Sequence, residues 1–302
     1  MTSPAERYRQ AARRDSTQRR YRQALEHFAD KWGGLLPASS ESVVRYLAAH
    51  AEQLSSATLR THLAALAQWH TQHGFADPTK QPQVRDVLRG IRAEHPRPIK
   101  QAEVLPLQAL EGCIAGLQVQ AASSDSAERL RAYRDQALIL LGFWRALRSD
   151  DLCRLRIEHI QLRPGQSLEV FLATGKTDRH HVGKTVSVPA LKRLCPVEAY
   201  ERWLAASGLQ QGPVFRAIDR WGHIGPDRLN PNSVSRLLRL AFVRNGLEGQ
   251  GYSGHSLRRG FATWASENEW GTKALMEYVG WRDVQSALRY IDANAPFGDW
   301  LR

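Results

Sequence analysis

The sequence has 302 residues, with 42 lysines and arginines against 30 aspartates and glutamates, and its formal net charge is +12. A content of 42% hydrophobic and 24% charged residues is typical of one large or two ordinary globular domains, and it excludes collagen-like and wholly disordered chains. The longest apolar run, Ala137 to Trp144, is far shorter than the roughly 20 residues of a membrane-spanning helix. We therefore predict a buried helix there and no membrane partner.

The cysteines and the N-terminus indicate a cellular compartment. Cys113, Cys153 and Cys195 are odd in number and widely spaced, so they form neither a disulfide framework nor a Cys-x-x-Cys metal site. The N-terminus has no apolar signal segment, and Glu6 and Asp15 interrupt an Arg-rich stretch that would otherwise be similar to a transit peptide. We expect an intracellular, cytoplasmic protein.

The basic charge is spread over both halves of the chain. This distribution favours a polyanion contacted along the whole molecule, and nucleic acid is the most common such partner. A soluble basic protein with no such partner remains the alternative.

Residues 1–95 predict a small helical bundle behind an Arg-rich arm. Residues 17–32 place Tyr21, Leu25, Phe28 and Trp32 on one helix face. Further helices are predicted after Ser39 and Ser40, from Ser56, and around residues 84–91. Arginines on the exposed faces fit either a bundle that grips DNA phosphates or ordinary solvated surfaces.

The segment EHPRPIKQ, with two prolines between periodic segments, predicts a linker at residues 96–101, followed by a second domain at 102–302. Apolar and polar residues alternate in two runs, SLEVFLAT and KTVSVP. These runs predict a β-hairpin with a long basic loop at 175–183. The helices predicted for this domain are 106–117, 126–144, 149–155, 196–207, 232–245, 256–266, 272–279 and 283–290.

Three motifs carry residues suited to phosphate chemistry. GHSLRRGFAT places His255 and Arg258 three residues apart on one helix face, which is weak evidence by itself. ALRSDDL places Arg148 directly after the apolar helix, with Asp151 one turn later to hold its guanidinium. VGWRDVQSALRYIDA then leads to Tyr290.

This ordered set resembles the tyrosine recombinase (phage integrase) family, and within it is most similar to the Cre-like recombinases. The matching motifs span about residues 140–295 and include Lys176 in ATGKTD and the Gly280–Trp281 pair. The site residues that the resemblance implies are Arg148, Asp151, Lys176, His255, Arg258, Trp281 and the nucleophile Tyr290.

The resemblance also implies a fold and an activity. The expected fold is mainly α with two domains, a helical-bundle core-binding domain that binds DNA and a mixed helical catalytic domain with a small antiparallel β-sheet. The expected activity is site-specific recombination or integration, in which DNA strands are cleaved and rejoined through a 3′-phosphotyrosine without metal, ATP or other cofactor. The implied partner is double-stranded DNA with paired recombination sites. The protein is expected to be a homotetramer in the synaptic complex and a monomer in free solution.

The chemistry explains why these residue types are needed. A phosphodiester attacked by an oxygen nucleophile gains negative charge. Two arginines can neutralise this charge through bidentate hydrogen bonds to the nonbridging oxygens. His255 and the Trp281 indole N–H add hydrogen-bond donors. Tyr290 has a reference pKa of about 10, so nearby cations must ease its deprotonation. Lys176 is the candidate acid that protonates the departing 5′-oxygen.

Several residues have other interpretations. Tyr290 and Trp281 could be core residues, and Asp151 could pair with Arg154 or Arg156. Lys184 competes with Lys176, while His180 and His181 lack a third ligand at metal-binding spacing. Arginines 145, 259 and 289 flank the site and contact either phosphate or water.

The sequence also leaves two other functions open. A type IB topoisomerase would use the same tyrosine chemistry to relax DNA, and a nonenzymatic DNA-binding regulator would have a degenerate site. A metal-dependent nuclease is disfavoured because the sequence has no clustered carboxylates for a two-metal centre.

Overall fold

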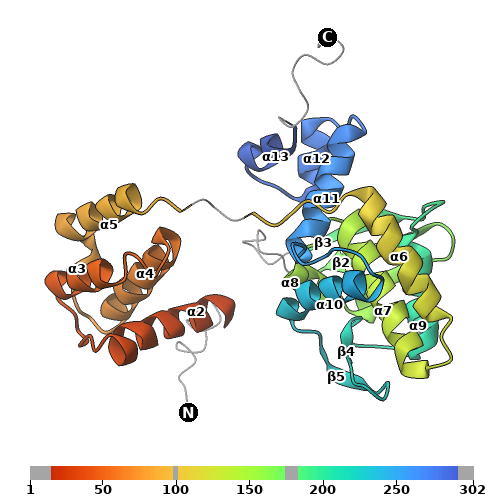
Figure 1. The fold of residues 1–302 in the computed structure, drawn as a ribbon, viewed down its shortest axis with the longest axis horizontal. Helices are drawn as coiled ribbons and strands as arrows, with labels where there is room; N and C mark the ends of the chain where they lie inside the picture. The colour runs from red at the N-terminus through yellow and green to blue at the C-terminus, as the bar shows by residue number, and fades with distance from the viewer. Residues whose placement is uncertain (1–14, 98–100, 174–182, 292–302) are drawn as a thin grey trace, which may run out of the picture. The chain divides into compact units, whose positions relative to one another are not determined.

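The computed structural model describes residues 15–97, 101–173 and 183–291. The chain divides into two compact units, residues 1–100 and 101–302, and the division falls within the predicted linker (Figure 1). Each unit has its own hydrophobic core. Within the described residues, no helix combines the length and the apolar character needed to cross a bilayer.

The first unit is helical, as predicted. It contains α2 (Asp15–Glu26), the π-helical turn η1 (His27–Lys31), α3 (Ser40–Ala49), α4 (Ser56–Gln72), the 3₁₀ turn η2 (Pro78–Lys80) and α5 (Pro82–Glu94). Two serines begin α3 and α4: the Ser39 hydroxyl accepts a hydrogen bond from the Ser42 N–H at 3.1 Å, and Ser55 accepts one from Thr58 at 3.1 Å. Helix α2 packs on α4 and α3 packs on α5. Their shared core buries Phe28, Val43, Tyr46, Leu47, Leu59, Leu66 and Val84.

Three histidines surround Tyr46 in this core. The Tyr46 hydroxyl lies 2.8 Å from His27 Nδ1 and 2.5 Å from His62 Nδ1, and His50 Nδ1 lies 2.9 Å from the Tyr46 carbonyl oxygen. Burial and the charges of His27 and His50 lower the pKa of His62 from 6.5 to about 4. Burial, His50 and Lys31 also lower the pKa of His27. The fold therefore favours the neutral imidazoles of His27 and His62.

We expect this cluster to make stability fall in acid. A histidine whose pKa is lower in the folded state stabilises the fold above its unfolded pKa, here 6.5, and that stability is lost as the pH falls toward about 4. After a reduction for solvent screening, protonation of His62 should lower the free energy of unfolding by about 1 kcal/mol when the pH falls from 7 to 5. Urea unfolding of the full chain at both pH values measures this loss.

The matched variants are His62→Asn, whose amide can replace Nδ1 but does not titrate, and His73→Asn at an exposed histidine of the same unit. His62→Asn should lose less stability in acid than the wild type, and His73→Asn should lose as much. An equal pH dependence in all three proteins would show that the cluster does not control acid stability.

The second unit is built around α7 (Ser126–Trp144), which is buried along most of its length. Helices α6 (Leu107–Ala121) and α9 (Pro196–Ser207) pack against it (Figure 1), and so does α11 (Gly254–Glu267). Because three helices cover it, α7 can be apolar through Ala137–Phe143, as the uninterrupted hydrophobic run predicts.

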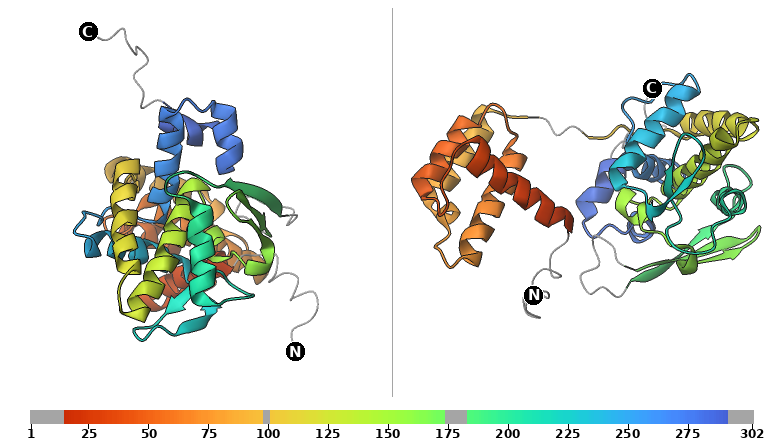
Figure 2. Two further views of the ribbon diagram at one scale, coloured as in Figure 1. Left: turned by 90° about the vertical axis from the view of Figure 1, so that its right-hand side faces the viewer. Right: turned by 90° about the horizontal axis from the view of Figure 1, so that it is seen from below.

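A three-stranded antiparallel sheet lies at one side of these helices (Figure 2). Strands β2 (Ser167–Leu172) and β3 (Lys184–Pro189) form the predicted hairpin, with Leu172 opposite Lys184. The prediction missed β1 (Ile160–Arg163) and a second hairpin of β4 (Arg216–Ile218) and β5 (Ile224–Arg228). These strands have three to five residues, too few for an alternating pattern to be recognised.

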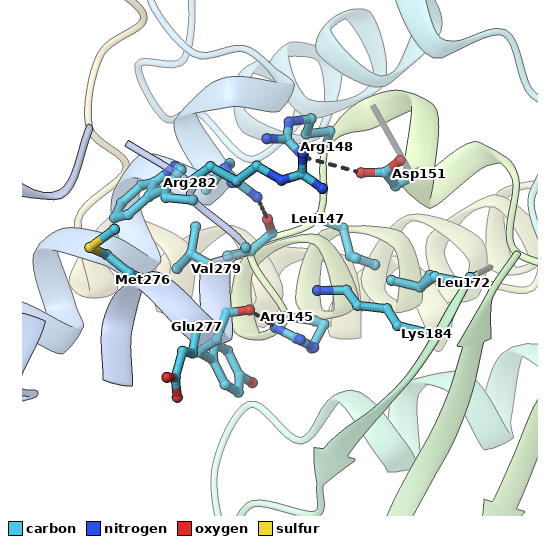
Figure 3. Close-up of a pocket in the computed structure, with 16 residues that line it drawn as sticks. Arg145, Leu147, Arg148, Asp151, Leu172, Lys184, Met276, Glu277, Val279 and Arg282 are labelled. Atoms are coloured by element: carbon cyan, nitrogen blue, oxygen red, sulfur yellow. Dashed lines mark hydrogen bonds and ion pairs between the residues drawn. The ribbon is translucent and has the colours of Figure 1, made fainter. Parts of the chain in front are cut away.

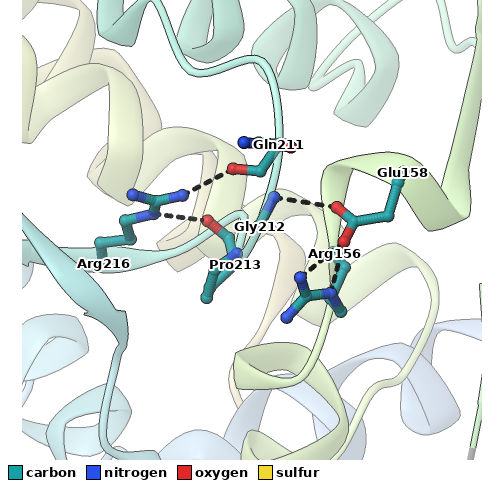
Figure 4. A network of polar contacts seen from close by, with 6 residues as sticks. All are labelled: Arg156, Glu158, Gln211, Gly212, Pro213 and Arg216. Carbon is teal, nitrogen blue, oxygen red and sulfur yellow. Dashed lines mark hydrogen bonds and ion pairs between the residues drawn. The ribbon is translucent and has the colours of Figure 1, made fainter.

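A polar network joins the chain before β1 to the chain before β4 (Figure 4). Glu158, in the 3₁₀ turn η3 (Ile157–His159), pairs with Arg156 at 2.6 Å and accepts a hydrogen bond from the Gly212 N–H at 2.9 Å. Arg216 donates from Nε to the Pro213 carbonyl at 2.9 Å and from Nη2 to that of Gln211 at 2.6 Å. The backbone hydrogen bonds of Glu158 and Gly212 lower the pKa of Glu158 to about 2, so its carboxylate stays charged.

The last helices of the unit are α10 (Pro231–Arg244), α11, α12 (Thr272–Val279) and α13 (Val284–Ile291). Gly260 lets α11 approach α7 closely: a Cβ atom there would lie 2.2 Å from the Leu105 carbonyl oxygen and 2.7 Å from Phe143 Cε2. Helices α12 and α13 pack against α11. This packing brings the chain around Arg258 to the end of α7.

Candidate active site

A tight reversal at the end of α7 positions two arginines. Arg145 ends the helix, and Ala146 adopts a left-handed conformation, with φ of 50°. The Leu147 N–H donates to the Gly142 carbonyl at 3.1 Å, which closes the turn as in a Schellman motif. Helix α8 (Ser149–Cys153) begins directly after Arg148. The turn therefore places Arg145 and Arg148 on the same pocket.

Asp151 lies one helical turn after Arg148 and forms an ion pair with it, with Asp151 Oδ2 3.8 Å from Arg148 Nη1. The predicted pairing is confirmed. Of the two alternative partners, Arg154 pairs with Asp150 at 3.1 Å and Arg156 pairs with Glu158 at 2.6 Å. Burial raises the pKa of Asp151, and the positive charge of Arg148 opposes that rise.

Arg258 reaches the same turn from α11. A capping box fixes the start of this helix, in which the Ser253 N–H donates to the Ser256 hydroxyl at 2.9 Å. The Arg258 side chain is nearly buried and donates from Nη1 to the Ala146 carbonyl at 2.5 Å. Its guanidinium carbon lies 5.5 Å from the centre of the Trp281 ring. Arg258 thus joins α11 to the α7–α8 turn and to Trp281.

The end of α12 forms the opposite wall. Gly280 ends the helix in a left-handed conformation, with φ of 74°, and the N–H groups of Gly280 and Trp281 both donate to the Met276 carbonyl, at 2.8 and 2.9 Å. The neighbouring Tyr278 is tied to α7, because its hydroxyl donates to the Trp144 carbonyl at 2.7 Å and its own carbonyl accepts a hydrogen bond from Arg145. The Arg145 guanidinium also lies over the Tyr278 ring, 4.1 Å from its centre.

These elements line a cavity of about 310 Å³ that is partly open to solvent (Figure 3). Its ionisable lining is mostly cationic, with two acidic side chains, Asp151 and Glu277. The cationic side chains are Arg145, Arg148, Lys184, Arg258 and Arg282. An excess of positive charge around a small cavity favours an anion the size of a phosphate group.

The structure brings together four of the predicted site residues, Arg148, Asp151, Arg258 and Trp281, which all line the cavity. His255 lies on α11 but is exposed and is not part of the described lining. Lys176, His180 and His181 lie outside the described residues, as do the side chains of Arg289 and Tyr290. The backbone of Tyr290 belongs to α13. Across the described ranges, no group of three or more His, Cys, Asp or Glu side chains is placed to hold a metal ion.

Three cations of the described cavity lining, Arg145, Lys184 and Arg282, were not among the predicted site residues. The sequence predicts only that Arg145 contacts phosphate or water, and it offers Lys184 only as an alternative to Lys176. The available signals were the position of Arg145 three residues before Arg148 and that of Lys184 at the start of a predicted strand. Tyr278 carried no such signal, because its contact with Arg145 joins residues 133 positions apart.

Comparisons with known proteins identify the family and the fold of the chain. The sequence model of the Phage integrase family matches residues 116–296. An "Integrase/recombinase xerD homolog" of Selenomonas ruminantium is 29% identical, covering 98% of this chain and 86% of the relative. "Recombinase cre" of Escherichia phage P1 is 26% identical over 86% of this chain and 77% of its own length. The XerH site-specific recombinase bound to palindromic difH substrate has the same fold, with a TM-score of 0.62 and 17% identity over 92% of this chain and 76% of that one.

Proposed function

The chain belongs to the phage integrase family, and from that premise we propose how its residues cut and rejoin DNA. It is a site-specific tyrosine recombinase, an enzyme that breaks and reseals DNA strands through a covalent bond to a tyrosine. One observation supports the roles below: Arg148 and Arg258, 110 residues apart in the sequence, line one cation-rich cavity beside Trp281.

The scissile phosphate binds in this cavity. Arg148 and Arg258 contact its nonbridging oxygens, and the Trp281 indole N–H supplies a further donor. His255, which lies outside the described lining on the same helix as Arg258, is proposed as an additional donor once DNA is bound. Asp151 is a positioning residue, since its ion pair with Arg148 orients that guanidinium. These cations stabilise the charge that develops in the five-coordinate transition state and do so without a metal ion.

Tyr290 is the nucleophile of the proposed reaction. Its hydroxyl oxygen loses a proton and attacks phosphorus, the bond from phosphorus to the 5′-oxygen breaks, and that oxygen takes a proton from Lys176. The product is a 3′-phosphotyrosine and a free 5′-hydroxyl. Attack by the 5′-hydroxyl of another strand reverses the sequence and releases Tyr290, so the energy of the phosphodiester is retained without ATP.

The proposal extends to the oligomeric state of the enzyme and to the role of each unit. The enzyme acts in the cytoplasm as a homotetramer on two recombination sites in double-stranded DNA and is a monomer when free. The first unit holds the DNA as a core-binding domain, and the second carries out the reaction. The net charge of +12 supports extended contact with a polyanion, and the similar XerH structure is a complex with difH DNA.

A plasmid assay in EDTA tests this function. The target site is first identified by sequencing DNA that is covalently trapped on the protein in cells, and two copies are placed on a supercoiled plasmid. We expect recombinant circles to form without added metal, because the arginines supply the charge stabilisation. Relaxation without recombinants would indicate a topoisomerase, binding without cleavage a regulator, and activity restored only by Mg²⁺ a metal-dependent nuclease.

A further inference from the structure

Lys184 is one of three cations of the described cavity lining, with Arg145 and Arg282, to which the proposed mechanism gives no role. It is the first residue of β3, opposite Leu172 of β2, and both residues line the cavity. Figure 3 shows its ammonium group directed into the cavity between Arg145 and Arg148. A residue that begins a paired strand has a fixed backbone, so the Lys184 side chain extends from a fixed point at one wall of the site.

The opposite wall leaves space for this amine. A Cβ atom added at Gly280 would lie 3.3 Å from Lys184 Nζ, so a side chain at that position would crowd the ammonium. Gly280 also has φ of 74°, a conformation that glycine adopts without strain. The end of α12 therefore approaches Lys184 closely while the amine stays open to the cavity.

The surroundings of Lys184 favour an anionic ligand. The pKa of Lys184 is lowered, although the residue as a whole is exposed. The main cause is the loss of water around the ammonium at the pocket wall, and repulsion by the charges of Arg145 and Arg258 lowers the pKa further. Arg145 is itself nearly buried, and its Nε has no hydrogen-bond partner among the described residues. A phosphate in the cavity would relieve the repulsion among these cations.

We propose that Lys184 is a further phosphate-binding residue of the active site, which places its ammonium on a nonbridging oxygen of the scissile phosphate. The inference rests on the proposed function, and it gives the two lysines different tasks. Lys176 protonates the departing 5′-oxygen, whereas Lys184 neutralises charge on the phosphate together with Arg148 and Arg258. Because the nonbridging charge grows in the transition state, Lys184 contributes to the rate as well as to binding.

The first test does not depend on catalysis. The full-length protein is acetylated briefly with an amine-reactive ester, and modification at each lysine is quantified by mass spectrometry during a titration with inorganic phosphate, at ionic strength held constant with NaCl. We expect phosphate to slow modification of Lys184 at least threefold and to leave Lys192 unchanged, since Lys192 is an exposed lysine of the same unit outside this cavity. Equal protection of the two lysines would overturn the proposal, even if the protein proves to be an active recombinase.

The second test separates charge neutralisation from proton transfer. Single-turnover cleavage is measured for Lys184→Ala, Lys176→Ala and the control Lys192→Ala on three duplexes, with an ordinary scissile phosphate, a bridging 5′-sulfur or a neutral methylphosphonate. Loss of one preorganised donor typically costs about 10²- to 10³-fold, and we expect about 10- to 100-fold for Lys184→Ala because two arginines remain. Lys184→Arg, which keeps the charge, should recover most of that loss.

The substrate pattern decides the role of each lysine. The Lys184→Ala defect should persist with bridging sulfur and nearly vanish with methylphosphonate, because the methyl group removes the charge that Lys184 neutralises. The Lys176→Ala defect should nearly vanish with bridging sulfur, since a thiolate leaves without a proton, and should persist with methylphosphonate. Sulfur rescue of Lys184→Ala would make it the proton donor, and cleavage by Lys184→Ala at the Lys192→Ala rate would remove it from the site. If the wild-type protein forms no covalent adduct, the proposed function fails, and the acetylation test still decides whether Lys184 binds phosphate.

Discussion

Replacement of Arg258 by alanine is expected to slow single-turnover DNA cleavage by about 10³-fold or more. The guanidinium is nearly buried, lines the cavity and is held against the Ala146 carbonyl, so it is preorganised for charge that develops on a nonbridging oxygen. Loss of one such donor typically costs about 10²- to 10³-fold, and hydrogen bonds from charged donors are about twice as strong as neutral ones.

The adjacent Arg259 provides a matched control. It lies on the same helix but donates to the Gln101 side chain and does not line the cavity. Each of Arg258→Ala and Arg259→Ala removes one positive charge, so their DNA affinities should fall by similar factors, but only Arg258→Ala should lose cleavage. Arg258→Lys should be intermediate, because an ammonium keeps the charge and loses the two-pronged geometry.

Folding must be measured in the same series. Removing the Arg258 guanidinium takes away the hydrogen bond to the Ala146 carbonyl, which is expected to cost about 1 to 3 kcal/mol of stability. Cleavage is therefore compared at a temperature where thermal unfolding shows both variants folded. If folded Arg258→Ala cleaves as fast as Arg259→Ala, Arg258 does not stabilise the transition state.

Long periodic segments made the helices predictable from the sequence. Residues 126–144 and 196–207 were predicted with the bounds that α7 and α9 have, because the apolar spacing and the capping residues agree there. Strand β1 and the β4–β5 hairpin were missed, since each strand is shorter than the window in which alternation can be recognised. The π-helical turn at His27–Lys31 was also missed, because the apolar face of residues 17–32 continues through it.

The site was predictable only in part. Four predicted residues belong to sequence motifs and line the cavity together: Arg148, Asp151, Arg258 and Trp281. His255 shares a helix with Arg258, yet a separation of three residues also displaces it along the helix axis by about 4.5 Å, and it falls outside the described lining. The contact of Arg145 with Tyr278 depends on how α12 docks against the end of α7. Local sequence does not encode that tertiary geometry.

The second large effect is expected at Tyr290. Tyr290→Phe removes only the hydroxyl group, so DNA binding should stay within about twofold of the wild type. Covalent attachment should be abolished, because phenylalanine has no oxygen with which to attack phosphorus. Both proteins are incubated with a suicide duplex, nicked so that the strand beyond the cleaved bond diffuses away, and the products are separated in SDS. An SDS-stable band of equal strength with Tyr290→Phe would exclude Tyr290 as the nucleophile.

Mapping the wild-type adduct tests the phosphotyrosine mechanism most directly. The chain has eight tyrosines, and trypsin releases residues 290–302 as a peptide in which Tyr290 is the only one. The adduct is formed in EDTA, digested with nuclease and trypsin, and sequenced by mass spectrometry. The proposed mechanism predicts a nucleotide 3′-phosphate on Tyr290 and unmodified tyrosines elsewhere. A nucleotide on another residue, or cleaved DNA with no nucleotide on the protein, would contradict it.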